Sequence, residues 1–146
     1  MGVRRKSREI AIQTLYSLDF AEKNEFLQEL GWIFLYKANM DNIMLDQKIK
    51  EGTRIYEFAE FLLKNSIQNI IKIDEEIAKN SQNWSMERLA LLDKSVLRIA
   101  IGEILFTDTP HTIIMNEAIE ISKKFCSEGS GKFINGILNA ISKNKV

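Results

Sequence analysis

The sequence predicts an all-α protein, a helical bundle formed by a single domain of 146 residues, 45% of them hydrophobic. Three observations lead to this fold class. Apolar residues recur at intervals of three and four along most of the chain, which is the period of an amphipathic helix. No Asn-Gly or Asp-Gly pair stands between two alternating runs, as it would in a β-hairpin. One proline and seven scattered glycines leave no linker-like segment.

The N-terminal part predicts two helices. The first is expected from about Arg4 to Phe20 and the second from about Glu25 to Asn39. The residues expected to be buried are Ile10, Ala11, Leu15 and Leu18 in the first helix, and Phe26, Leu30, Ile33 and Phe34 in the second. Each set follows the offsets of one helical face, so both helices should turn that face toward a common core.

The middle of the chain predicts a loop, a long helix and a boundary. The helical pattern weakens over residues 40–52, which indicates a loop with a short turn. It returns over residues 53–79 and indicates a long helix, bent once. The polar run 80–83 interrupts the pattern. We therefore expect two packed halves within the one domain, residues 1–83 and 84–146.

The C-terminal half predicts further helices. Ser85 can cap a short helix, and Asp93 can cap the next one, in which the apolar spacing is regular. Pro110 ends that segment, and another helix is expected to reach about Phe125. The glycine-containing loop 126–131 then leads into a last helix. This pattern completes the predicted bundle.

Charge is segregated along the chain although its net value is zero. Residues 1–8 carry four basic and no acidic side chains, and residues 121–146 carry five basic against one acidic. Residues 9–120 carry eleven basic and nineteen acidic side chains. If the fold brings the two ends together, they form one basic surface on an acidic protein, which attracts the phosphates of a nucleic acid.

Several classes of protein are disfavoured. With one cysteine, Cys126, and one histidine, His111, the chain cannot form an internal disulfide or a Cys/His zinc cluster, so we expect no metal site and no cofactor. No segment approaches the roughly 20 apolar residues of a membrane span, and acidic and polar residues follow the basic N-terminus where a signal peptide would be apolar. We expect a soluble, cytoplasmic protein.

Catalytic residues are not apparent. His111 has no cysteine or serine nucleophile beside it in the sequence. Lys123 and Lys124 could lower the pKa of the Cys126 thiol, but its place at the end of an apolar helix favours a buried, unreactive side chain. The sequence therefore predicts a binding protein and not an enzyme.

The basic opening segment is the first candidate for RNA binding. On a helix, Arg4 and Arg8 stand one turn apart with Arg5 and Lys6 between them, and like charges at this spacing repel. They also lie at the positive end of the helix dipole. A phosphate between them would relieve both effects. The alternative is a solvated end of the chain in which Arg5 pairs with Glu9.

The loop and helix start at residues 127–133 are the second candidate. Free backbone N–H groups at a helix start can bind a phosphate, and Lys132 adds a positive charge. Phe133 could stack on an unpaired base, or it could be part of the core together with Ile137 one turn later. The segment is not a phosphate-binding P-loop, because Phe133 stands where a magnesium-binding Ser or Thr is required.

A longer pattern lies in the C-terminal half. It consists of Leu92 to Ala100, Glu103 to Leu105, Pro110, Asn116 to Glu120, Lys123 to Phe125 and Lys132 to Leu138. This pattern closely resembles the NusB family of transcription antitermination factors. The opening segment Arg4 to Glu9, followed by Gln13, Leu15 and Tyr16, is similar to the first helix of that family. Residues 24–80 match only in their general helical character.

The resemblance implies an all-α fold of two packed three-helix subdomains and RNA binding without catalysis. Proteins of this family bind boxA, a short single-stranded element of nascent transcripts that include ribosomal RNA leaders, together with NusE, a small-subunit ribosomal protein. That complex joins RNA polymerase and the other Nus factors and suppresses premature termination. Some members are thought to form a homodimer.

The resemblance also implies site residues. By position, the RNA contacts would come from Arg4, Arg5, Lys6, Arg8, Ser130, Lys132 and Phe133. Tyr16 and Asp93 would contact NusE, which places an acidic group opposite a basic ribosomal protein. Gly129 stands at a loop position where some relatives carry an acidic residue, a difference that would affect RNA affinity or loop flexibility.

Two other functions agree with parts of the sequence. One is a protein-binding helical adaptor that uses the acidic middle of the chain and does not contact RNA. The other is a stand-alone relative of the NusB-like N-terminal domain of an rRNA cytosine methyltransferase. A methyltransferase needs a glycine-rich turn between a strand and a helix to bind its cofactor, and these 146 residues contain none.

Overall fold

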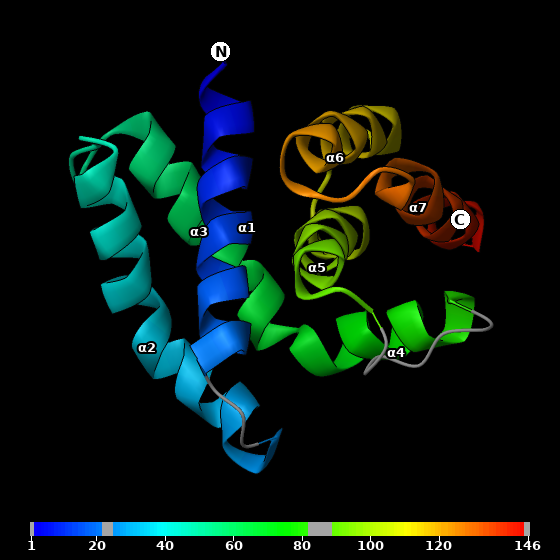
Figure 1. Cartoon of the computed structure of the whole chain (residues 1–146), viewed down its shortest axis with the longest axis horizontal. Coiled ribbons are helices and arrows are strands. Elements are labelled where there is room, and N and C mark those ends of the chain that lie inside the picture. Colours follow the sequence, from blue (N-terminus) through cyan, green and yellow to red (C-terminus); the bar gives the residue numbers. More distant parts are fainter. Residues whose placement is uncertain (1, 22–24, 82–88, 145–146) are drawn as a thin grey trace.

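The computed structural model describes residues 2–21, 25–81 and 89–144, and within them the chain forms seven helices and no strand (Figure 1). They are α1 (Val3–Ala21), α2 (Glu25–Asp46), α3 (Arg54–Gln68), α4 (Ile70–Asn80), α5 (Leu91–Phe106), α6 (His111–Phe125) and α7 (Ser130–Asn144). The all-α prediction is confirmed, and the first helix lies within one residue of its predicted bounds at each end.

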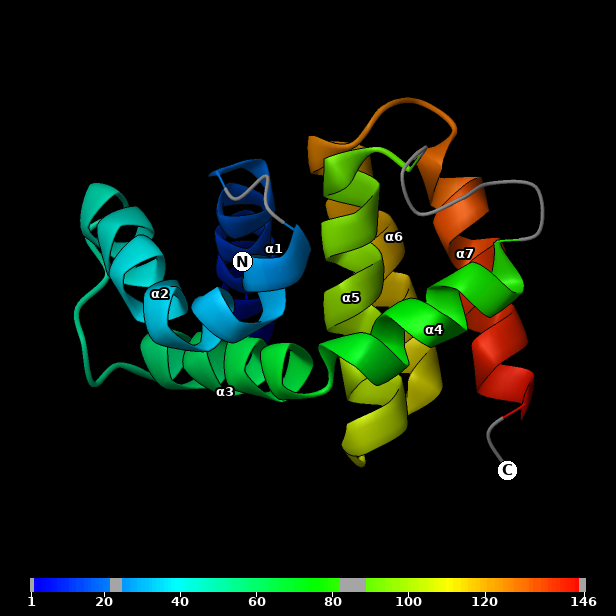
Figure 2. The same cartoon turned by 90° about the horizontal axis from the view of Figure 1, so that it is seen from below.

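The helices form two groups that share one core. Helices α1, α2 and α3 pack against one another, and α4 to α7 form the second group (Figures 1 and 2). Helix α4 packs mainly against α5 and α7, although it follows α3 directly in the sequence. The division between the groups therefore falls at Asn69, between α3 and α4, and not at the predicted boundary 80–83. The second group has four helices in the described part of the chain instead of three.

Helix α2 differs most from its prediction. It continues to Asp46, seven residues beyond the predicted end at Asn39. Its buried face is Trp32, Tyr36, Met40 and Met44, whereas the side chain of Phe34 is 82% exposed. Both sets have helical spacing, and the Trp32 set was missed because its last members lie beyond the predicted end. The side chains of Phe26 and Leu30 are not among the side chains that the structure describes.

The residues at the starts of the other helices agree only in part with the predicted caps. Thr53 caps α3, since its Oγ1 accepts a hydrogen bond from the backbone N–H of Tyr56 at 3.2 Å. Helix α5 begins at Leu91, so Asp93 lies inside its first turn and is not the cap that the sequence predicted. The predicted cap Ser85 lies outside the described residues.

Helix α5 belongs to the second group but also packs against α1 and α3 of the first, and it is buried on every side from Ser95 to Ile104. A Cβ atom on Gly102 would lie 2.6 Å from Ser66 Oγ on α3, so glycine allows these two helices to approach closely. The Asn65 side chain then donates a hydrogen bond to the Gly102 carbonyl oxygen at 3.0 Å. This close contact joins the first group of helices to the second.

A buried arginine joins four helices near the C-terminal end of α1. Arg98 of α5 donates two hydrogen bonds to the carboxylate of Asp74 on α4, each at 2.9 Å, and one to Asp19 on α1 at 3.0 Å. Its guanidinium carbon lies 5.3 Å from the ring centroid of Trp32 on α2. We call Arg98, Asp19 and Asp74 the Arg98 cluster.

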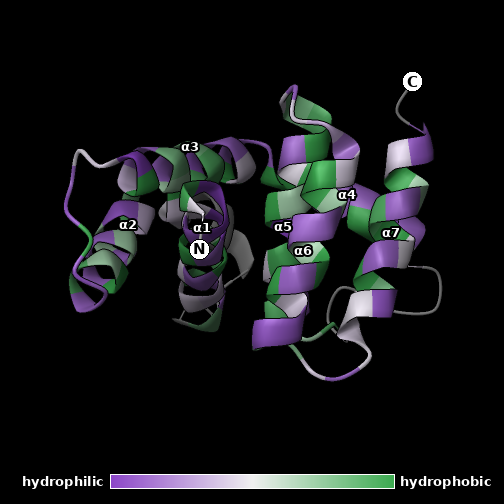
Figure 3. Cartoon of the chain, turned by 90° about the horizontal axis from the view of Figure 1, so that it is seen from above, coloured by the Kyte–Doolittle hydropathy of each residue, from purple (hydrophilic) through white to green (hydrophobic). Residues whose placement is uncertain are grey.

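Hydrophilic residues occur along every helix of the bundle (Figure 3). Among the described residues, none of the helices has the length and apolar character needed to cross a membrane.

Candidate nucleic-acid interface

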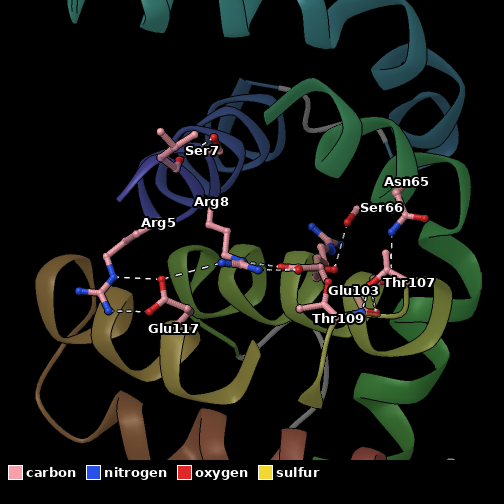
Figure 4. Close-up of polar contacts among 12 residues, drawn as sticks. Arg5, Ser7, Arg8, Asn65, Ser66, Glu103, Thr107, Thr109 and Glu117 are labelled. Carbon is pink, nitrogen blue, oxygen red and sulfur yellow. Dashed lines mark hydrogen bonds and ion pairs between the residues drawn. The ribbon is translucent and has the colours of Figure 1, made fainter. Parts of the chain in front are cut away.

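The basic start of α1 lies along α6. Arg5 Nε and Nη2 donate hydrogen bonds to the Glu117 carboxylate at 3.1 and 2.5 Å (Figure 4). One turn later, Lys124 Nζ donates to Glu9 Oε1 at 3.2 Å. Two successive turns of α1 therefore contact positions two turns apart on α6. The pair of Arg5 with Glu9, which the sequence allowed as an alternative, is replaced by partners on another helix.

Arg8 points from the same helix into the protein. Its Nε and Nη2 atoms donate hydrogen bonds to Glu103 of α5 at 2.7 and 2.8 Å, and both side chains are buried. Glu117 lies within 3.8 Å of Arg8 Nη1. The structure thus places Arg8, one of the residues predicted to bind RNA, with its guanidinium covered and already paired with a carboxylate. We call Arg5, Arg8, Glu103 and Glu117 the Arg8 cluster.

The repulsion between Arg4 and Arg8 is relieved without a phosphate. Phe58 of α3 lies next to both guanidinium groups, with its ring centroid 4.1 Å from Arg4 Cζ and 5.5 Å from Arg8 Cζ. The ring offers its electron-rich face to the two cations. Together with Glu103, it offsets the cost of placing two arginines one turn apart at a helix start.

Three of the predicted RNA-binding cations have no acidic partner in the described part of the chain. They are Arg4, Lys6 and Lys132, and of these Arg4 and Lys132 are exposed. The side chain of Arg5 is 37% exposed although it is paired. Its hydrogen bond to Glu117 raises the pKa of Arg5, and the same hydrogen bond lowers the pKa of Glu117. Arg5 therefore combines a fixed position with an accessible guanidinium.

The loop before α7 forms the second predicted segment. Gly129 has a φ of +93°, a conformation that favours glycine, and Ser130 begins α7 directly after it. Ser130 is buried and its Oγ donates a hydrogen bond to Asp93 Oδ2 at 3.1 Å. Phe133 is half-buried and packs against the core. The side chain therefore combines the two alternatives, because part of it joins the core and part remains exposed.

A hollow of about 710 Å³ lies beside this loop. Lys123 and Ser122 of α6 line one side of it, and Lys132 and Asn135 of α7 line the other. Gly129 and its neighbours in the loop also line it. Lys123 also pairs with Glu120 at 3.1 Å, so Lys132 is the more available cation of the two.

The two basic segments lie on opposite sides of α6. Helix α6 packs against α1 on one side and α7 on the other (Figure 1). The loop reaches the other end of α1, where Cys126 and Ser127 lie in one hollow with Tyr16 and Phe20. The expected single basic surface is thus divided by α6, which carries acidic residues between its two parts.

Tyr16 and Asp93, the residues expected to contact NusE, line one hollow of about 290 Å³. Phe20 also lines it and is 63% exposed; its ring lies 6.0 Å from that of Tyr16 between centroids, tilted by 33°. Sequence spacing did not single out Phe20, since it stands at the end of the predicted first helix. This hollow combines an acidic group with exposed aromatic surface.

Cys126 lies in the same hollow. Burial first, and then a hydrogen bond and charge from Asp93, raise the pKa of its thiol to about 12. The nearby lysines Lys123 and Lys124 do not reverse this shift. The thiol therefore stays protonated at neutral pH and has no nucleophilic character, in agreement with the interpretation that the sequence favoured.

Comparisons with known proteins agree on one family. Residues 5–143 match the NusB family. The transcription antitermination protein NusB of Geotalea daltonii is 38% identical over 147 residues, which cover 99% of this chain and 97% of that protein. Among solved structures, NusB of T. maritima has a TM-score of 0.79 and 32% identity, covering 97% of this chain and 91% of that one. The antitermination factors NusB and NusE in complex with dsRNA include a chain with a TM-score of 0.81 and 26% identity, with 98% of each chain covered.

Proposed function

The chain belongs to the NusB family, and we propose that it binds boxA-type single-stranded RNA in nascent ribosomal RNA transcripts together with NusE. It is a transcription antitermination factor and not an enzyme. In the proposed role it acts in the cytoplasm, where its RNA and NusE complex joins RNA polymerase and the other Nus factors and opposes premature termination.

The observation that carries the proposal is the set of unpaired cations. Arg4, Lys6 and Lys132 occupy the two segments that the resemblance assigns to RNA, and none of them is neutralised by an acid among the described residues. A cation that already has a carboxylate partner gains less from a phosphate, because the new contact must replace an old one. Both segments where RNA is expected therefore carry positive charge that is available to a phosphate.

The other predicted residues take different parts in this proposal. Arg5 would share its guanidinium between Glu117 and a phosphate, since more than a third of its side chain is exposed. Arg8 would act indirectly, by holding the start of α1 on α5 through Glu103. Ser130 would fix the start of α7 through Asp93, and the exposed part of Phe133 would stack on a base.

The hollow around Tyr16 and Asp93 supports a protein partner. A basic ribosomal protein such as NusE would meet the Asp93 carboxylate there and cover the exposed ring of Phe20. This surface lies at the opposite end of α1 from Arg4. RNA and NusE could therefore be bound at the same time, on different parts of one helix.

The proposal is tested with labelled boxA RNA, titrated with and without NusE at several salt concentrations. An Arg4/Arg5/Lys132→Ala variant should bind more weakly, and the dependence of log K on log salt should flatten by about 0.7 for each lost phosphate contact. A matched control, Lys64/Lys72/Lys79→Ala, removes the same charge from α3 and α4. It should bind nearly as well as the wild type.

Full-strength binding by the folded Arg4/Arg5/Lys132 variant would overturn the assignment of the site. If the wild type binds NusE but no RNA under any condition, the protein-binding adaptor is the better description. The hollow around Tyr16 and Asp93 would then be its functional surface.

A further inference from the structure

A separate hollow lies between the start of α1 and α3. Its volume is about 590 Å³, and it is lined by Val3, Arg4, Arg54, Glu57, Phe58 and Phe61. None of these α3 residues is among those that the resemblance assigns to RNA or NusE. The hollow begins at Arg4, which belongs to the proposed RNA interface.

The hollow contains a fixed aromatic stack. The rings of Phe58 and Phe61 lie 6.1 Å apart between centroids, with an interplanar angle of 16°. Phe58 is half-buried and held by Arg4, whereas Phe61 is 49% exposed. An aromatic ring that is positioned by a neighbour and still exposed can stack on a ligand without a large loss of side-chain freedom.

The charges around the stack fit a nucleotide better than a bare phosphate. Arg4 and Arg54 are exposed and have no acidic partner in the part of the chain that the structure describes. The Glu57 carboxylate lies in the same hollow and would repel a phosphate placed at its centre. It can, however, accept a hydrogen bond from the exocyclic amino group of a base.

We propose that this hollow binds one unpaired nucleobase of the RNA, stacked on Phe61, with its flanking phosphates on Arg4 and Arg54 and its amino group toward Glu57. The inference rests on the proposed RNA-binding function and extends the RNA path from α1 onto α3. Bases with an exocyclic amino group, which are adenine, cytosine and guanine, are preferred over uracil because only they can present that group to Glu57.

Phe61→Ala tests the proposal. The variant should bind single-stranded boxA RNA about tenfold more weakly, since stacking of a base on an aromatic side chain contributes on this order. The slope of log K against log salt should stay unchanged, because stacking releases no counterions. Phe61→Trp, which keeps an aromatic ring at this position, should bind the RNA as tightly as the wild type does. The control is Phe34→Ala, which removes an exposed phenylalanine from α2 and should have no effect.

Glu57→Gln tests the proposed base preference. The wild type should bind an oligonucleotide with cytosine at the stacked position more tightly than one with uracil there, and the variant should lose most of that difference. Thermal unfolding of each variant checks that the fold is retained. Because both side chains are exposed at least in part, the unfolding temperature should change little.

The outcomes separate this inference from the proposed function. If Arg4/Arg5/Lys132→Ala weakens RNA binding but Phe61→Ala does not, the base site is wrong and the proposed function stands. Equal losses in Phe61→Ala and Phe34→Ala, or a flatter salt slope in Phe61→Ala, would also overturn it. If none of these variants affects binding, both proposals fail.

Discussion

Two clusters of arginine and acidic side chains hold α1 against the rest of the protein, and they differ in how they meet solvent. In the Arg98 cluster, one arginine satisfies two carboxylates and all of its side chain is buried. In the Arg8 cluster, two arginines share Glu103 and Glu117, and Arg5 remains accessible. Ion pairs of the same kind are therefore buried at the C-terminal end of α1, whereas at its N-terminal end they leave an arginine able to bind an anion.

The difference follows from the number of charges. The Arg98 cluster has two acids for one arginine, so a phosphate would be repelled there. The Arg8 cluster has two acids for two arginines, and Arg4 adds a cation beside it. Whether a cluster attracts RNA therefore depends on whether its acidic or its basic groups are in excess, and not on the presence of arginine alone.

The largest effect is expected from Arg98→Met. Removing the arginine leaves Asp19 and Asp74 without the cation that joins four helices, and breaking such a buried pair costs about 3 to 5 kcal/mol of unfolding free energy. Urea denaturation measures the loss. Lys94→Met, which removes a cation without an ion pair from the same helix, should cost far less. A loss below about 1 kcal/mol for Arg98→Met would contradict the proposed role of this cluster.

A smaller loss is expected from Glu103→Gln. The glutamine keeps one hydrogen bond to Arg8 but no longer balances its buried charge, which should cost about 2 kcal/mol in urea denaturation. RNA affinity of the folded variant should change less than twofold, because Arg8 is covered. A large change in RNA affinity with no change in stability would mean that Arg8 contacts RNA after all.

Glu117→Gln tests the accessible side of the same cluster. Its effect on unfolding free energy should be about 0.5 to 1 kcal/mol at neutral pH, since the pair with Arg5 is partly exposed to solvent. The pKa of Glu117 is lowered in the folded state, so the contribution of the pair is present above the ordinary value of 4.5 and is lost as the pH falls through the folded value. The difference between wild type and variant should shrink below that pH. A constant difference down to low pH would show that the charge of Glu117 is not the cause.

The smallest effect is expected on RNA binding by the same variant. Once Arg5 is released from Glu117, a phosphate no longer competes with a carboxylate, and affinity should rise by about two- to fivefold. Glu120→Gln is the matched control, because it removes the same charge from α6. Glu120 pairs with Lys123 and not with Arg5. An equal rise in both variants would indicate a general charge effect instead of competition for Arg5.

Local spacing predicted the helices well where each had one apolar face. The first helix was placed within a residue at each end because its buried residues alternate with clearly polar ones. Helix α2 has apolar residues on more than one face, so the sequence favoured Phe34 over the Trp32 set. The place of α4 was missed because its partners, α5 and α7, follow it in the sequence.

The candidate site was predictable only in part. A basic segment can be recognised without knowing which of its members are covered, and Arg8 is covered by Glu103, which lies 95 residues away. The acid that pairs with Arg5 is 112 residues away. Tyr16 and Asp93, which the resemblance and not the spacing selected, line the same hollow, and their contact with NusE stays a prediction. The aromatic stack on α3 lies in the region where the resemblance was weakest.

The burial of α5 on every side has a consequence for how the protein opens. A helix that packs against both groups cannot lose one of them without exposing apolar surface to water, so the two groups should unfold together in a single cooperative transition. The backbone amides of residues 95–104 should then exchange with deuterium only through global unfolding, more slowly than those at either end of the chain. We therefore expect the whole helical bundle to behave as one cooperative unit.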